Sequence, residues 1–262
     1  KDYFIMIAER NIYGVVYKNI LYITAPLLLV IIPVALYRFY ACSKNKLFRL
    51  LLFLLLFSAI LISGNRASIA IGCMAVLITA FWIYSPMKRF LLCIFCIVLF
   101  SCFIFNFYGS ILGSFAADNS SSVRIGHLYS YMEFFMNYPL CFFTGSGPGS
   151  IFYSIGFEKD CAYTELSLLE ILRQTGFFGL LCFLVLYLYP CFLLLGKKNK
   201  IPYAIPALIG YLAFFIVATT NPFLLNSTGF LALWLIFSIS ENPCNQIQLE
   251  KNEKNGNSSC FV

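Results

Sequence analysis

The chain has 262 residues, of which 61% are apolar and only 11% are charged. A soluble domain has about 45–50% apolar and about 25% charged residues, and a chain of this size cannot hide the excess from water. Composition therefore excludes a soluble enzyme, a nucleic-acid-binding module and a disordered chain, despite a net charge of +7. It predicts an all-α polytopic protein with the lipid bilayer as its main surroundings.

Seven apolar runs are long enough, or nearly so, to cross a bilayer as helices. They cover residues 21–40, 47–62, 67–84, 90–108, 175–195, 201–219 and 223–240. The predicted organisation has four parts. These are four membrane helices with short loops in 1–108, a large outer loop in 109–163, three membrane helices in 164–240 and a disordered cytoplasmic tail in 241–262.

The basic residues between the apolar runs predict the orientation. Leaving out the first 20 residues, eleven Lys and Arg lie on one side and four on the other. Because Lys and Arg accumulate in cytoplasmic loops, the loop 109–163 is predicted to lie outside. The outer cations are Arg66, Arg124, Lys159 and Arg173, and an arginine kept outside against this rule needs a further explanation.

Arg66 follows the short turn 63–65 and opens the third apolar run. Two explanations for it stay open. Its side chain can reach lipid phosphates at the membrane boundary. Alternatively, it forms an anion site with the free N–H groups and the positive dipole end of the helix that it begins.

The outer loop contains a predicted amphipathic helix over residues 123–138, which Pro139 ends. Arg124 lies in its first turn, and His127, the only histidine, follows one turn later. His127 is a candidate proton carrier, although an interfacial polar role is more common for such a residue. The apolar stripe of the helix is expected to face the outer membrane interface; it comprises Ile125, Leu128, Tyr129, Met132, Phe135 and Met136.

A glycine-rich stretch, residues 143–150, follows this helix. It lacks the Gly-Lys-Ser/Thr of a Walker A loop. A flexible turn explains the stretch, and so does a close approach of its backbone to a sugar or a phosphate at Gly145 and Gly147. Cys141 and Cys161 lie in the same outer loop, where a disulfide between them is one alternative.

A helix is predicted from residue 163 into the fifth apolar run. It carries Glu165, Glu170 and Arg173 near the hydrocarbon, where ionisable side chains are costly and usually functional. Glu165 and Arg173 are eight residues apart, which predicts a shared helix face. Glu170 and Arg173 can pair at i, i+3, and this pairing leaves Glu165 without a local partner.

Three motifs in this order resemble the O-antigen polymerase and O-antigen ligase superfamily over about residues 50–240. The first is the Ser-rich turn that ends at Arg66. The second combines Arg124, the Asn-Tyr-Pro-Leu turn at 137–140 and the Gly-Ser-Gly at 145–147. The third is Thr-Glu at 164–165 before two glycines. The ligases of the superfamily have His-Asn at this place. Glu165 therefore favours a polymerase of repeat units over a ligase.

The resemblance implies a GT-C-like fold and a multi-pass protein of the bacterial inner membrane with its catalytic loop on the periplasmic side. It implies polymerisation of polyprenyl-diphosphate-linked oligosaccharides into O-antigen- or capsule-like polysaccharide, with a flippase and a chain-length regulator as partners. We expect no metal, because the outer loop carries no paired acidic motif, and we expect no cofactor. A chain that begins with Lys1 is expected to be the C-terminal part of a longer enzyme.

In this interpretation Glu165 takes the proton of the acceptor hydroxyl, while Arg66 and Arg124 stabilise the departing diphosphate. Substrate-binding roles are expected for Arg173, His127, Gly145, Gly147 and Asn65. Three alternatives stay open: a ligase that transfers finished glycan to an acceptor, a membrane transporter of glycolipid, and a structural membrane subunit. A transporter would often show internal repeats, and none is evident in the sequence.

Overall fold

The computed structural model describes residues 5–12, 15–22, 25–42, 45–63, 65–89 and 119–241. Over these ranges the chain is mostly helical, with two β-hairpins that the all-α expectation did not include. It divides into two compact units. Unit 1 is formed by residues 1–79, 186–218 and 224–262, and unit 2 by residues 80–185 and 219–223. The apolar run 90–108 and the tail after 241 lie outside the described residues.

A β-hairpin opens the described chain. Strands β1 (Ile5–Ile12) and β2 (Val15–Tyr22) pair antiparallel, with Ile5 opposite Tyr22 and Ile12 opposite Val15. β-Branched and aromatic residues recur along both strands and favour extended backbone. The predicted membrane run 21–40 is therefore wrong at its start, since residues 21–22 belong to β2 and helical structure begins only beside Pro26, a residue that fits a first helical turn.

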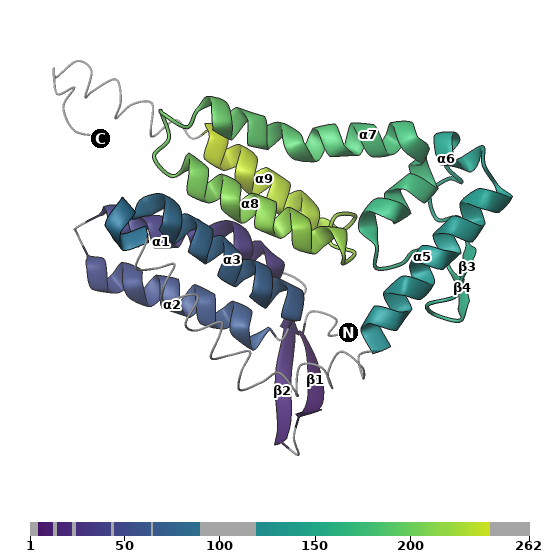
Figure 1. Ribbon diagram of the computed structural model, residues 1–262, viewed down its shortest axis with the longest axis horizontal. Coiled ribbons are helices and arrows are strands. Elements are labelled where there is room, and N and C mark those ends of the chain that lie inside the picture. The colour runs from purple at the N-terminus through teal and green to yellow at the C-terminus, as the bar shows by residue number, and fades with distance from the viewer. Residues whose placement is uncertain are drawn as a thin grey trace. The chain divides into compact units, whose positions relative to one another are not determined.

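Small residues let the helices of unit 1 approach closely. A Cβ on Gly210 would lie 2.6 Å from the carbonyl oxygen of Val30, and a Cβ on Gly72 would lie 3.1 Å from Leu29. These contacts bring α8 and α3 against α1. The helical elements that lie wholly or mostly in unit 1 are the 3₁₀ turn η1 (Ala25–Leu27), α1 (Leu28–Ala41), α2 (Lys46–Ile62), α3 (Arg66–Ile83), α8 (Ala204–Thr219) and α9 (Ser227–Glu241) (Figure 1).

The longest helix, α7 (Ser167–Gly196), is broken at Gly176, where φ is 73° and ψ is −177°. Among the described residues it is the one helix both long and apolar enough to cross a bilayer. Four shorter apolar helices fall within or near the other predicted runs, at Ala25–Ala41, Ala67–Ile83, Ala204–Thr219 and Ser227–Glu241. One membrane-span candidate is thus observed, and a total of seven membrane helices stays a prediction.

Unit 2 confirms the helix predicted over residues 123–138, observed as α5 (Asn119–Asn137), and adds elements that were not predicted. These are the short α6 (Cys141–Thr144) and a hairpin of β3 (Phe152–Ser154) and β4 (Lys159–Cys161). Gly126 of α5 meets the hairpin turn so closely that a Cβ there would lie 2.7 Å from the backbone of Gly156. Gly126, His127 and Ser130 of α5 are therefore buried against the hairpin, whereas most of the apolar stripe of α5 is exposed.

Candidate functional site

Two charged residues at the start of α7, Glu170 and Arg173, are fully buried. Arg173 Nη2 lies 2.5 Å from Glu170 Oε1, which confirms the pairing predicted from the i, i+3 spacing. A buried charge requires such a partner, because desolvation of an isolated ion would cost several kcal/mol. The pair is therefore a fixed structural element of unit 2.

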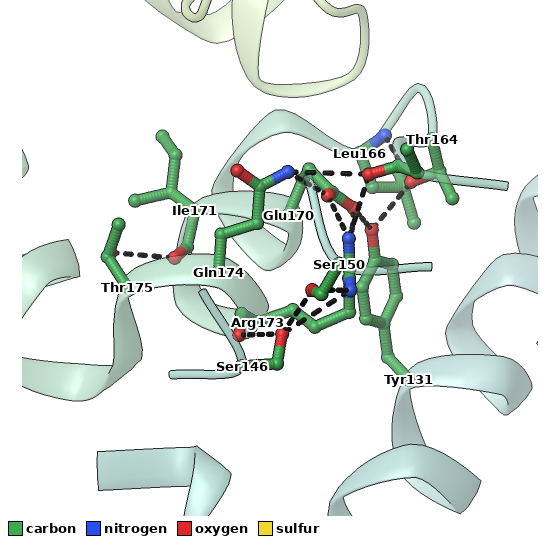
Figure 2. Close-up of polar contacts among 11 residues, drawn as sticks. Tyr131, Ser146, Ser150, Thr164, Leu166, Glu170, Ile171, Arg173, Gln174 and Thr175 are labelled. Carbon is green, nitrogen blue, oxygen red and sulfur yellow. Dashed lines mark hydrogen bonds and ion pairs between the residues drawn. The ribbon is translucent and has the colours of Figure 1, made fainter. Parts of the chain in front are cut away.

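Arg173 also binds the loop that precedes α7 (Figure 2). Its Nη1 donates to Ser150 Oγ at 2.7 Å and its Nη2 donates to the carbonyl of Ala162 at 2.8 Å. The guanidinium carbon lies 4.3 Å from the ring centroid of Phe152, in a cation–π contact. A guanidinium enclosed in this way has no free face for a ligand, so the geometry supports a positioning role for Arg173 rather than the expected substrate contact.

Glu170 connects α7 to α5. Its carboxylate accepts hydrogen bonds from Tyr131 Oη and Gln174 Nε2, both at 2.5 Å, and Tyr131 Oη lies 2.7 Å from Thr164 Oγ1. Burial and the adjacent carboxylate raise the pKa of Tyr131 far above its usual value, which keeps the phenol protonated and able to donate. The network thus joins α5, the segment before α7 and α7 itself (Figure 2).

Two predicted catalytic residues, Arg124 and Glu165, meet at the edge of this network. Arg124 Nε lies 3.5 Å from Glu165 Oε2, and the two side chains are 37% and 40% exposed. This separation exceeds that of a good hydrogen bond, and Arg124 Nε has no hydrogen-bond partner within the described chain. Glu165 directly follows the buried Thr164, so the network fixes the backbone beside an ion pair that is itself accessible.

The predicted helix from residue 163 is wrong at its start, because α7 begins only at Ser167. Thr164 Oγ1 accepts a hydrogen bond from the N–H of Leu166, a local turn that competes with helical hydrogen bonding. Glu165 and Arg173 therefore do not share a helix face. The absence of a local partner for Glu165 is consistent with the structure, since its partner Arg124 comes from α5.

His127 is fully buried between α5 and the hairpin. Its Nδ1 lies 2.7 Å from Ser154 Oγ, its ring meets Phe157 edge-on, and its Nε2 has no hydrogen-bond partner within the described part of the chain. Burial lowers the pKa of His127, against the opposing influence of the carboxylates of Glu165 and Glu170. A neutral, enclosed imidazole supports packing of the hairpin rather than the expected substrate contact.

The glycine-rich stretch caps the break in α7. Gly145 and Gly176 both have positive φ, and a Cβ on either would clash with backbone atoms at the other. The N–H groups of Ser146 and Gly147 donate to the carbonyls of residues 173–174 at 2.8 and 3.0 Å. The break deprives these carbonyls of their helical partners, and the loop supplies new ones. Gly147 itself faces open space, so its contact with substrate stays a prediction.

Asn65 and Arg66 lie in unit 1 at the start of α3. Asn65 Oδ1 accepts hydrogen bonds from the N–H groups of Ala67 at 3.1 Å and Ser68 at 3.3 Å, as a helix N-cap does. The cap occupies two of the N–H groups that an anion site would use. A site that combines Arg66 with Arg124 of unit 2 stays a prediction.

The sequence interpretation gave no role to five network residues, which are Tyr131, Ser146, Ser150, Thr164 and Gln174. Tyr131 is seven residues after Arg124, and this spacing places both on one side of α5; that signal was available. The serines offered no comparable signal, because their contacts depend on a loop conformation. Cys141 and Cys161 are both free thiols, so the disulfide alternative is not observed.

A family model described as O-antigen ligase matches residues 51–184, just over half of the chain. The matched segment contains α3, all the elements of unit 2 described above, the Arg124–Glu165 pair and the buried network. No match is found among curated proteins. Members of the matched family are bacterial membrane proteins and glycosyltransferase-like enzymes, polymerases or ligases, whose substrates are lipid-linked oligosaccharides. The chain belongs to the O-antigen ligase family.

Proposed function

We propose that the chain polymerises polyprenyl-diphosphate-linked oligosaccharide repeat units and that Arg124 and Glu165 form its reaction centre. The observation that carries this proposal is the half-exposed Arg124–Glu165 ion pair beside a fully buried network. Family membership supports the polymerase-or-ligase class. The carboxylate at 165, in place of the ligase His-Asn, favours the polymerase.

The proposed reaction is a direct glycosyl transfer. A hydroxyl oxygen of the acceptor attacks the anomeric carbon of the donor and forms the new glycosidic bond. The bond from that carbon to the diphosphate oxygen breaks, and its electron pair leaves with the diphosphate. Glu165 takes the hydroxyl proton and later returns it to water, while Arg124 binds the diphosphate oxygens with parallel N–H groups. Arg66 is proposed as a second cation for the diphosphate, and this scheme uses no metal.

The ion pair also suggests how donor binding prepares the base. Arg124 and Glu165 neutralise each other across 3.5 Å. A diphosphate carries more charge than one carboxylate and competes for the guanidinium. Once Arg124 turns to the donor, Glu165 is free to accept a hydrogen bond from the acceptor hydroxyl. In this proposal the carboxylate becomes available as a base only in the presence of the donor.

The test is a glycan length profile from cells that lack the protein and are complemented with full-length variants. Wild type and the control Glu158→Gln, an exposed carboxylate of the hairpin turn, should restore a ladder of chain lengths. Arg124→Ala and Glu165→Gln should leave single repeat units only. Normal ladders in both variants would contradict the assignment and favour a glycolipid transporter.

A ligase is the second candidate, because the matched family model carries that description. In that case Arg124→Ala and Glu165→Gln should accumulate full-length polymer on its lipid carrier, not joined to the final acceptor. For either enzyme we propose a periplasmic reaction at the inner membrane. A flippase would deliver the donor, and a chain-length regulator would act with the polymerase.

A further inference from the structure

An open pocket of about 420 Å³ lies in unit 2 between α5 and the β3–β4 hairpin. Its volume falls within the range of about 300–1,000 Å³ that is common for small-molecule sites. The lining includes two carboxylates, Glu133 and Asp160, and the amide of Asn137. It also includes the aromatic rings of Phe134, Tyr138 and Tyr153. The reaction scheme above uses none of these side chains.

Of the polar side chains in the lining, Ser130 bonds to the backbone of Gly126 and Ile155, whereas the two carboxylates and the amide have no internal partner in the described part of the chain. Glu133, Asn137 and Asp160 are exposed, and none of their side chains forms a hydrogen bond or ion pair with another described residue. Glu133 and Asn137 are one turn apart on α5 and share a face. Asp160 is opposite Tyr153 in the hairpin register, so the two side chains lie on the same side of the hairpin. Helix α5 and the β3–β4 hairpin thus both contribute unpaired polar side chains to this pocket.

The aromatic part of the lining rests on the buried network. Phe134 and Phe152 both line the pocket, and the Arg173 guanidinium carbon lies 5.9 and 4.3 Å from their ring centroids. Contact with the buried Arg173 side chain therefore fixes the positions of both rings. Tyr138 and Tyr153, in contrast, are each 58% exposed. The pocket combines a rigid aromatic floor with exposed phenol rings at its sides.

We infer that this pocket binds an uncharged, hydroxyl-rich sugar unit of the glycan, an inference that rests on the proposed function. Carboxylates and amides bind sugar hydroxyls in bidentate fashion, and aromatic rings cover the C–H faces of sugar rings. The lining contains Glu133 and Asp160 but no Lys or Arg. Two uncompensated carboxylates repel uronic acids and phosphorylated sugars, which selects for a neutral unit.

The pocket is separate from the proposed reaction centre. Glu133 follows Arg124 by nine residues on α5, a rise of about 13 Å along the helix. A sugar bound there does not contain the reacting bond. Binding energy from such a remote unit positions the glycan chain for transfer. The pocket therefore fixes the position of the repeat unit relative to the reaction centre.

The test measures binding directly, with the full-length protein in lipid nanodiscs. The probe is the oligosaccharide released by mild acid from the lipid-linked glycan of the bacterium that carries the chain. Saturation-transfer NMR gives both its affinity and the sugar unit in contact. The variants are the double substitution Glu133→Gln/Asp160→Asn and the single substitution Tyr153→Ala. Matched controls are Glu158→Gln and Tyr163→Ala, an exposed carboxylate and an exposed phenol outside the pocket.

Both pocket variants should bind the oligosaccharide at least about tenfold more weakly than wild type, because each loses direct contacts. The controls should stay within about twofold, and the saturated unit should be a neutral sugar. Unchanged binding in both variants, no binding by wild type, or strongest saturation of an acidic sugar would overturn the inference. If the double variant fails to elute as a folded protein, Tyr153→Ala decides alone.

This measurement separates the subsite from the proposed function. Arg124→Ala should abolish the glycan ladder and leave oligosaccharide binding within about twofold of wild type. A normal ladder in that variant would contradict the reaction centre without affecting the binding result. Unchanged binding in the pocket variants would remove the subsite even where the ladder result supports a polymerase.

Discussion

The buried Glu170–Arg173 pair gives a quantitative prediction about stability. Glu170→Gln keeps the shape of the side chain but removes the charge that compensates Arg173. In the wild-type chain the Glu170 carboxylate accepts hydrogen bonds from Tyr131, Arg173 and Gln174. Both members of the pair are fully buried. Removing one partner of such a pair costs about 3–5 kcal/mol, because the other charge stays buried without compensation.

The assay is thermal unfolding of the full-length protein in detergent, followed by the loss of the folded elution peak. A loss of about 3–5 kcal/mol corresponds to a fall in Tm of roughly 6–20 °C for a chain of this size. The control Glu158→Gln replaces an exposed carboxylate and should change the stability by less than about 0.5 kcal/mol. If Glu170→Gln melts within about 2 °C of wild type, the pair is not the structural element argued here.

A double-mutant cycle extends this prediction. Glu170→Leu alone leaves the Arg173 guanidinium buried, and Arg173→Leu alone leaves the Glu170 carboxylate buried, so each single variant should destabilise strongly. The double variant Glu170→Leu/Arg173→Leu contains no buried charge and should lose less stability than the sum of the single losses, by about 2–3 kcal/mol. Additive losses would show that the two side chains do not act as a pair.

Three further predictions concern the rest of unit 2. Gly145→Ala should destabilise by at least about 2 kcal/mol more than Gly149→Ala in the same melting assay, since both glycines have positive φ but only the first would clash with backbone. Because burial lowers the pKa of His127, the unfolded chain binds more protons below about pH 6.5; Tm should fall between pH 7.5 and pH 5, and less so in His127→Gln. Arg124→Ala and Glu165→Gln should abolish the glycan ladder yet change unfolding stability by less than about 1 kcal/mol, because this pair is half-exposed.

Local patterns in the sequence predicted the parts of unit 2 that depend on neighbouring residues. The apolar periodicity and Pro139 identified α5, and the i, i+3 spacing identified the Glu170–Arg173 pair. Both rest on the geometry of a single helix, which the spacing of side chains reveals directly. The same reasoning failed at Glu165, where one hydroxyl–backbone hydrogen bond delays the start of α7.

Contacts between distant segments could not be predicted in this way. Arg124 meets Glu165 across 41 residues only because the hairpin turns the chain back onto α5. The strands of that hairpin have three residues each, too few for a reliable alternating pattern. The close approach of Gly145 to Gly176 likewise depends on two backbone conformations, and neither is visible in residue type alone.

The break at Gly176 has a consequence for how α7 enters the bilayer. After the break the helix continues to Gly196, about 20 residues with a rise of about 30 Å, the thickness of the hydrocarbon core. The segment before the break is therefore not needed to cross the membrane. Its charged residues can remain at the depth of the lipid headgroups while the apolar segment inserts. The backbone break at Gly176 thus separates a charged first segment, suited to the headgroup region, from an apolar second segment, suited to the hydrocarbon core.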